Sequence, residues 1–330
     1  MKKRGVGFAV GLYPTGMSGG GDSSQAVVKV KPDGSVDLIL TSVDIGQGCK
    51  TVLAQIAAEE LGVPYDRVDV VNDDTDTGPL CFGTFASRVT FVAGNATKQA
   101  AREAKQILFS VAADKLEASP EDLEAANGKI YVKGAPERSV DIGAIAGEAT
   151  FGLRKVIVGR GHYMRTPSAP DPATGKTDPF ATLAWAAVEA EVEVDTDTGE
   201  VTVLRLDCAY DVGRAINPLL AEGQIQGGAV MGIGAALMEQ LYPYKSPVKF
   251  PAETFGDYVI PTAVDVPEVT AAIYECPSTD GPFGAKGIGE MTANAPSPAI
   301  VAAVHDAIGV WIDELPITPE KVLRALQAKG

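Results

Sequence analysis

The chain has 330 residues, of which 45% are hydrophobic and 22% charged, a balance typical of a globular protein with a sizeable core. Its formal net charge of −15 argues against a nucleic-acid partner and against an anionic membrane surface, because phosphate groups would repel it. No segment reaches the ~20 consecutive apolar residues that span a bilayer, and the first apolar run is too short and too broken by glycine for a signal peptide. We therefore expect a cytoplasmic protein that binds neither nucleic acid nor membrane and acts on a small molecule.

The cysteines are too scattered to build a metal centre from neighbouring ligands. There are four of them, at positions 49, 81, 208 and 276, and none forms a C-x-x-C pair. Zinc ribbons and iron–sulfur clusters take closely spaced thiolates. The sequence therefore predicts that any iron–sulfur centre in the pathway of electrons lies on another chain.

The first half of the chain shows a hairpin and a helix after a glycine-rich start. Residues 5–21 contain so many glycines that we expect a loop without regular structure. Residues 26–30 and 36–43 alternate around Pro32-Asp33-Gly34, which predicts a strand–turn–strand unit.

A glycine turn, Gly46-Gln47-Gly48, then leads into a helix with an apolar side formed by Val52, Ile56 and Leu61. A turn of this kind at a helix N-terminus presents backbone N–H groups and the positive end of the helix dipole to an anion. Two interpretations remain open from the residues alone, an anion-binding turn and a purely structural one.

Further elements follow up to residue 183. We expect a strand at 68–71, a polar loop at 72–79 whose three aspartates are either a cation site or a solvated turn, and a long helix at 89–116. A helix capped at Ser119-Pro120 and a second hairpin come next. Residues 160–183 are rich in proline and predict a long irregular loop, in which the lone His162 is read as a surface residue rather than a ligand.

The second half of the chain repeats the pattern of the first. Residues 188–194 and 201–209 alternate around a turn at 197–199, and Asp211-Val212-Gly213 follows them as Asp44-Ile45-Gly46 follows the first hairpin. The helix expected next contains five glycines, which predicts that another backbone or a ligand approaches it closely, because glycine weakens a helix by about 1 kcal/mol relative to alanine. We expect an α+β fold with two related hairpin-plus-helix subdomains, near 1–159 and 184–330, joined by the loop 160–183.

A single acidic residue ends the last glycine-rich loop. Glu290 follows four glycines between Gly281 and Gly289, and a helix is expected from about Ser297 to Gly309. A glutamate in a largely apolar, glycine-lined loop is suited to act as a general base near neutral pH. The alternative is a surface turn with one solvated carboxylate.

Four motifs occur together and in order: GQG, SR-x-T-x-x-x-GNA, DVGR-x-INP-x-x-x-x-GQ-x-x-GG and GAKG-x-GE. In this order they resemble the molybdenum-cofactor subunit of the molybdenum hydroxylases, the family of xanthine dehydrogenase and aldehyde oxidoreductase. The resemblance covers the chain from near its start to near its end and corresponds to the second half of the family's large subunit. It is similar to the split arrangement of nicotinate dehydrogenase, whose molybdopterin subunit comes as two chains, this one matching the medium chain.

The resemblance implies roles for individual residues. Glu290 matches the active-site base, although Met291 and Thr292 replace the proline pair that follows it in several members. The implied cofactor contacts are Gly46, Gln47, Gly48, Ala86, Ser87, Arg88, Thr90, Gln224, Gly227, Lys286 and Gly287. Arg88 has a structural alternative, an exposed arginine paired with an acid. No side chain is expected to ligate the metal, because the pterin dithiolene holds molybdenum in this family.

The resemblance also implies an activity and an assembly. The expected enzyme hydroxylates an N-heterocyclic aromatic compound, purine-like or nicotinate-like, with oxygen from water, and is active only with partner subunits. Its cofactor is molybdenum-molybdopterin in the cytosine dinucleotide form common in bacterial members, while 2Fe-2S clusters and FAD lie on partner subunits. The partners are a larger molybdopterin subunit, an iron–sulfur subunit and an FAD subunit. Aldehyde oxidation, aromatic acyl-CoA reduction and a non-catalytic scaffold role remain as alternatives.

Overall fold

The computed structural model describes residues 1–18, 21–72, 74–165, 168–240 and 254–329. The chain forms two compact units that exchange segments: unit 1 comprises 1–13, 183–276 and 288–330, and unit 2 comprises 14–182 and 277–287. The predicted subdomains near 1–159 and 184–330 did not include this exchange. The start of the chain joins unit 1 because its strand pairs with a strand from the second half.

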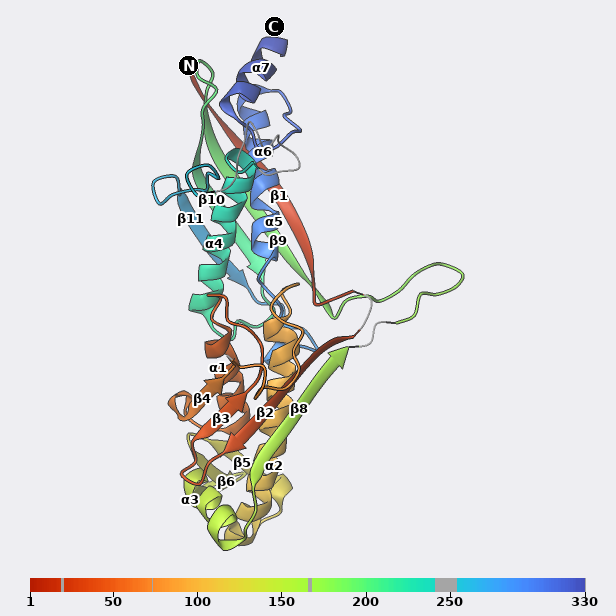
Figure 1. The fold of residues 1–330 in the computed structure, drawn as a ribbon, viewed down its shortest axis with the longest axis vertical. Coiled ribbons are helices and arrows are strands. Elements are labelled where there is room, and N and C mark those ends of the chain that lie inside the picture. Colours follow the sequence, from red (N-terminus) through yellow and green to blue (C-terminus); the bar gives the residue numbers. More distant parts are fainter. Residues whose placement is uncertain (19–20, 73, 166–167, 241–253, 330) are drawn as a thin grey trace. The chain divides into compact units, whose positions relative to one another are not determined.

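Unit 2 is built on a four-stranded sheet of order β4-β3-β2-β8 (Figure 1). The strands are β2 (Asp22–Val30), β3 (Val36–Ile39), β4 (Val68–Val71) and β8 (Ile157–Arg165). The β2–β3 hairpin is confirmed, and α1 (Cys49–Leu61) connects β3 to the parallel strand β4. Helix α2 (Gly94–Leu116), preceded by a π-helical turn at Val89–Ala93, packs on β2 and β8.

A smaller sheet completes unit 2. It contains β5 (Leu123–Ala126), β6 (Lys129–Val132) and β7 (Ala135–Asp141), followed by α3 (Ile142–Gly147) and a π-helical turn at Glu148–Gly152. Short 3-10 turns lie at Tyr65–Arg67, Pro120–Asp122 and Pro282–Gly284. The helix expected after Ser119-Pro120 is therefore wrong: only one 3-10 turn forms before β5 begins.

Unit 1 repeats this architecture. Its sheet has the order β1-β9-β10-β11, with β1 (Lys2–Thr15), β9 (Thr182–Asp195), β10 (Val201–Asp211) and β11 (Glu268–Tyr274). Strand β10 is antiparallel to β9 and parallel to β11, and α4 (Pro218–Leu237) follows β10 as α1 follows β3. The remaining helices are α5 (Met291–Asn294), α6 (Pro296–Ile308) and α7 (Pro319–Lys329). The predicted duplication of hairpin plus helix in an α+β fold is confirmed.

Glycine lets a helix lie directly on an edge strand in both units. On β8, a Cβ atom at Gly161 would lie 1.8 Å from the Ala96 carbonyl oxygen of α2. On β1, a Cβ atom at Gly7 would lie 2.1 Å from the Ala303 nitrogen of α6. The loop expected at 5–21 is therefore wrong in its first part, because these glycines mark close packing of a strand rather than a flexible segment.

The irregular segment expected at 160–183 is shorter than expected, since β8 runs to Arg165 and β9 begins at Thr182. Residues 166–167 within it lie outside the described part of the chain. Among the described residues, none of the helices has the length and apolar character needed to cross a membrane.

Candidate functional site

The glycine turn before α1 is closed by its own aspartate. The Asp44 carboxylate accepts hydrogen bonds from the backbone N–H groups of Gly46 (3.0 Å), Gly48 (3.2 Å) and Lys50 (3.1 Å). Burial opposes the charged form of Asp44, but these donors and the Lys50 charge outweigh it and hold the pKa of the carboxyl below its ordinary value. Of the two interpretations left open for this turn, the structural one accounts for the N–H groups of Gly46, Gly48 and Lys50, which are occupied by Asp44.

Gln47 stiffens the same turn. Its Oε1 accepts from the Ile45 N–H at 2.7 Å, and its Nε2 donates to the Val43 carbonyl oxygen at 3.1 Å. Gly46 is exposed with φ 104°, and a Cβ atom there would meet nothing within 4 Å. The turn thus presents a fixed, open backbone surface at Gly46 rather than a set of free donors.

The loop before α2 contains two consecutive left-handed residues that are not glycine. Ala86 has φ 49° and Ser87 has φ 50°. Such conformations cost of order 1–3 kcal/mol each, and they persist where the surroundings impose them. Here the Ala86 carbonyl oxygen accepts from the Gly16 N–H at 2.9 Å, and the half-buried Thr90 lies in the π-helical turn that follows. Strain and π-turns both concentrate at functional sites.

Arg88 holds this loop from the inside. Its side chain is fully buried, and Nε donates to Asp22 Oδ1 at 2.5 Å. The terminal nitrogens donate to the carbonyl oxygens of Ser23 (2.7 Å) and Gly83 (2.8 Å). The structural alternative of an arginine paired with an acid is therefore realised, but in a buried form. The side chain has no exposed surface for a ligand, so a contact from this residue would have to come from its backbone.

Cys81 lies beside the same guanidinium. Its Sγ atom is within 3.0 Å of Ser24 Oγ and 3.2 Å of both Ser42 Oγ and an Arg88 nitrogen. Burial favours the neutral thiol, but these donors and the Gly83 N–H outweigh it and lower the pKa of Cys81. Burial instead raises the pKa of the Cys49 and Cys208 thiols to about 12.

The predicted contact stretches of unit 2 are joined to one another. A Cβ atom at Gly287 would lie 1.8 Å from the Ser87 carbonyl oxygen, so only glycine allows the two loop backbones to come this close. The Gly287 N–H donates to Thr15 Oγ1 at 3.2 Å, and the neighbouring Lys286 is buried. Thr84 Oγ1 donates to the Val43 carbonyl oxygen at 2.6 Å, which links the loop before α2 to the turn before α1.

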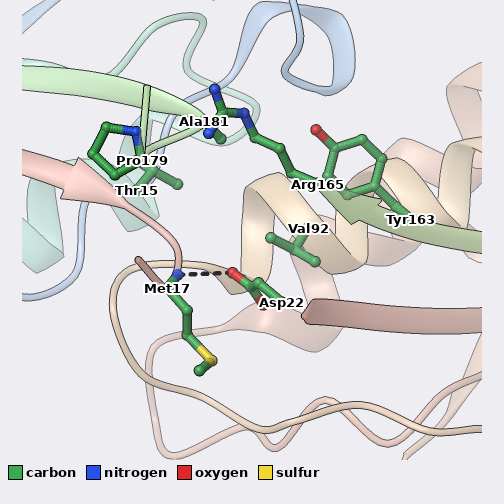
Figure 2. Close-up of a pocket in the computed structure, with 8 residues that line it drawn as sticks. All are labelled: Thr15, Met17, Asp22, Val92, Tyr163, Arg165, Pro179 and Ala181. Carbon is green, nitrogen blue, oxygen red and sulfur yellow. Dashed lines mark hydrogen bonds between the residues drawn. The ribbon is translucent and has the colours of Figure 1, made fainter. Parts of the chain in front are cut away.

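Unit 2 also contains a small pocket (Figure 2). Asp22 lines it and accepts from the Met17 N–H at 2.9 Å, while Tyr163 and Arg165 come from the end of β8. The empty space within it, open solvent included, is about 260 Å³. None of the predicted contact residues lines this pocket, but two of its lining residues contact them, since Thr15 accepts from Gly287 and Asp22 pairs with Arg88.

In unit 1, Glu290 is exposed at the start of the short helix α5. The next residue, Met291, is fully buried, and Thr292 Oγ1 donates to the Gly289 carbonyl oxygen at 2.7 Å. The buried hydroxyl of Tyr210 donates to the Thr292 carbonyl oxygen at 2.9 Å. Met291 and Thr292, which depart from the proline pair of several family members, therefore anchor the backbone that carries Glu290.

Tyr13 of β1 lies in the electrostatic field of Glu290. Partial burial and the negative charge of Glu290 together raise the pKa of the Tyr13 phenol. Sequence reasoning missed Tyr13 because residues 5–21 were read as a loop. The sequence feature that could have identified it is the alternation of small and large residues along β1. Alternation puts Tyr13 on the same side of the strand as the glycines at 5, 7 and 11.

Four of the five glycines of α4 fall into two groups. Gly228 and Gly232 face the α5–α6 segment, where Cβ atoms would lie 2.0 Å from Thr292 Oγ1 and 2.6 Å from Pro296. Gly223 and Gly227 are exposed, and Cβ atoms on them would meet nothing within 4 Å. Gln224, which lies between these two glycines in the sequence, is half-buried. The helix thus leaves an open backbone surface at the predicted contacts Gln224 and Gly227.

The last glycine-rich loop also differs in detail from expectation. Of its four glycines only Gly284 has a positive φ, of 92°, next to Phe283 with φ 53°, whereas Gly281 and Gly287 are required by close contacts. Helix α6 begins at Pro296 rather than at Ser297, whose hydroxyl donates to the Gly232 carbonyl oxygen at 2.8 Å. Gly309 ends the helix with φ 68°, as predicted.

The predicted site residues fall on both units. Unit 2 holds the contacts at 46–48, 86–88, 90 and 286–287, while unit 1 holds Gln224, Gly227 and Glu290. Within the parts of the chain that the structure describes, no group of three or more His, Cys, Asp or Glu side chains could hold a metal ion. Asp73 of the acidic loop lies outside the described residues.

Comparison with known proteins places these features in a family. The family model described as "Molybdopterin cofactor-binding domain" matches residues 1–267. The gamma subunit of the 6-hydroxypseudooxynicotine dehydrogenase complex of Paenarthrobacter nicotinovorans is 35% identical over 99% of this chain and 40% of its own length. The large subunit of nicotine 6-hydroxylase from the same organism is 36% identical over 91% of this chain and 36% of its own length.

Solved structures agree with the sequence relatives. Quinoline 2-oxidoreductase from Pseudomonas putida 86 superposes with a TM-score of 0.86 at 31% identity, covering 99% of this chain and 42% of that one. The chain therefore spans about two fifths of the length of such relatives, as the covered shares of 40% and 42% show.

Proposed function

Because this chain belongs to the molybdopterin cofactor-binding domain family of the molybdenum hydroxylases, we propose that it forms part of the cofactor site of a multi-subunit oxidoreductase. The observation that carries the proposal is the series of loops that close on one another in unit 2. The strained Ala86–Ser87 turn, the Gly287 contact with Ser87 and the self-capped turn at Gly46 form one connected backbone surface.

The residues present fit a pterin cofactor. Open space at Gly46 and Gly227, where a Cβ atom would meet nothing within 4 Å, leaves room for a ligand to approach the main chain. The proposed contacts are Gly46, Gln47, Gly48, Ala86, Ser87, Thr90, Lys286 and Gly287 in unit 2, the backbone of Arg88, and Gln224 and Gly227 in unit 1. When bound, molybdenum-molybdopterin, in the cytosine dinucleotide form, supplies the redox chemistry.

Glu290 is the proposed general base. Its carboxylate accepts the proton that the water-derived nucleophile gives up as that nucleophile attacks the substrate. The buried Met291 and the hydrogen bonds of Thr292 fix the backbone on which it stands. An exposed carboxylate on such a fixed support can reach a substrate without a change of the surrounding fold.

The proposed substrate is an N-heterocyclic aromatic compound. Nicotine, 6-hydroxypseudooxynicotine and quinoline appear in the names of relatives that match nearly the whole chain, and each name denotes a nitrogen compound. Relatives are also named as subunits of complexes, which supports partner chains. We assign the partners as a larger molybdopterin subunit, a 2Fe-2S subunit and an FAD subunit.

The test is a Glu290→Gln variant in the assembled, cofactor-loaded complex. Removal of a general base typically lowers the rate by about 10²- to 10⁴-fold, and we expect this loss with unchanged molybdenum content. Glu137→Gln, at an exposed position of β7, is the matched control and should leave turnover unchanged. Full turnover of the Glu290→Gln complex at normal loading would contradict the assignment of the base.

A further inference from the structure

One face of the unit 1 sheet is apolar and exposed at one end. The outward side chains of β1 and β9 there are Val6 (51% exposed), Phe8 (61%), Val10 (68%), Leu12 (46%) and Trp185 (57%). We call these five residues the β1–β9 apolar face. Large contiguous apolar surfaces on a folded protein usually mark a site of association.

These side chains contribute little to the core of unit 1. The opposite side of β1 carries Gly5 and Gly7, which lie directly under α6, and the partly buried Ala9 packs against the core. The strand is therefore held by its small residues, and the large ones point away from the helices. Among the residues that the structure describes, the core cluster of unit 1 does not include these large side chains.

The other end of the same strand pair is protected by charge. Lys2 pairs with Glu193 at 2.7 Å, and Arg4 approaches Glu191 and Glu193 at 3.4 and 3.6 Å. From Lys2 to Arg4 the residue number rises along β1, while that of the paired glutamate falls from 193 to 191 along β9, so the two strands are antiparallel. The end of β1 that carries Leu12 therefore lies beside the end of β9 that carries Trp185. Charged pairs of this kind shield an edge strand from unwanted pairing, and the apolar end lacks them.

We propose that the β1–β9 apolar face is the surface on which the larger molybdopterin subunit docks. This inference rests on the proposed function, since it names the contact surface for that partner. The choice of partner rests on the length of the relatives. The gamma-subunit relative and quinoline 2-oxidoreductase each match 99% of this chain, but the matched part is only 40% and 42% of their own length. In those relatives one polypeptide supplies the additional structure. Relatives are also named as subunits of complexes, so the proposed occupant of the apolar face is the family segment carried by the larger molybdopterin subunit.

The chemistry of the partner surface follows from the face. It should present apolar and aromatic side chains opposite Phe8, Val10 and Trp185, because burial of large apolar groups supplies most of the energy of such contacts. Cationic side chains at its rim would complement the net charge of −15 of this chain.

The experiment compares recovery of the partner with tagged variants in the native host. Phe8→Glu combined with Val10→Glu tests the face, and Phe151→Glu, at a residue of unit 2 that is 78% exposed, is the control. Mass spectrometry identifies the partner by its complementary family segment, and molybdenum is measured separately in each preparation. A charge buried in an interface centre typically weakens binding by about 30-fold or more.

We expect the double variant to recover less than a tenth of the partner per tagged chain, while Phe151→Glu recovers the wild-type amount. Because both altered side chains are exposed, the isolated variant should keep the wild-type circular dichroism spectrum and unfolding midpoint. Wild-type recovery by the double variant would overturn the proposal. So would a homodimer of the isolated chain that the same double variant dissociates. A complex that depends on the face but contains no molybdenum would support the surface and count against the proposed function alone.

Discussion

Arg88→Met should strongly destabilise unit 2, because it leaves a buried carboxylate without its cation. Asp22 is 5% exposed and Arg88 is fully buried, with 2.5 Å between Nε and Oδ1. Breaking a buried ion pair from one side costs about 3–5 kcal/mol. The loss of the hydrogen bonds to the Ser23 and Gly83 carbonyl oxygens adds to this cost, and the apolar methionine side chain recovers part of it.

The assay must report on unit 2. Both tryptophans, Trp185 and Trp311, lie in unit 1, so their fluorescence follows the other unit. Native-state hydrogen exchange of the β2 and β8 amides measures the opening free energy of the sheet next to Arg88. We expect it to fall by about 3–5 kcal/mol, a large fraction of the 5–15 kcal/mol that stabilises a typical domain.

Arg102→Met is the matched control. Arg102 also pairs with an acid of unit 2, Glu60, at 3.2 Å, but its side chain is 57% exposed. Glu60 is buried, but Lys105 also pairs with it at 2.9 Å, so loss of the exposed Arg102 does not leave the carboxylate without a cation. An exposed partner of this kind contributes about 0–1 kcal/mol, so the control should change little. A loss for Arg88→Met no greater than that for Arg102→Met would refute the reasoning. In the Asp22→Asn and Arg88→Met double variant, the cost should be smaller than the sum of the two single costs.

Three further outcomes follow from the structure. Gly228→Ala should destabilise unit 1 because its Cβ would lie 2.0 Å from a threonine hydroxyl, whereas Gly223→Ala on the same helix should stabilise it by about 1 kcal/mol; urea unfolding followed by tryptophan fluorescence compares the two, and equal effects would contradict the packing. Cys81 should react with iodoacetamide at pH 8 faster than the buried thiols whose pKa values are about 12, because a lowered pKa increases the thiolate fraction. Peptide mapping gives the rates, and preferential labelling of a buried thiol would be inconsistent with the donors around Cys81. Glu290→Gln should lower the pKa of Tyr13, since removal of the negative charge favours the phenolate; ultraviolet titration against a Tyr13→Phe background reads the change, and an unchanged pKa would mean that the two groups do not interact.

Much of the fold followed from local patterns in the sequence. The hairpin around Pro32-Asp33-Gly34 and the repeated one at 197–199 were readable because turn chemistry and alternation agree there. The order of the sheets was not readable, because strand β1 pairs with β9, far away in the chain. Glycine misled the reading of β1: Gly5 and Gly7 indicate a loop by composition, yet they are needed for the close approach of α6.

The candidate site shows the same division. Family motifs identified Ser87 and Gly287 separately, and the structure adds that these residues touch. The occupied N–H groups at Gly46 could not be foreseen, because nothing local distinguishes an aspartate that caps the turn from one that points to solvent. The burial of Arg88 likewise depends on Asp22, which lies on a strand that is distant in sequence.

The central claim is that this chain holds part of a molybdopterin site. Its most direct test is the molybdenum and pterin content of the chain purified by a tag from its native host together with the proteins that co-elute. We predict about one molybdenum and one pterin per copy, a stoichiometry that follows from one cofactor site per assembled unit. An intact assembly that contains neither metal nor pterin would contradict the account and favour a scaffold role.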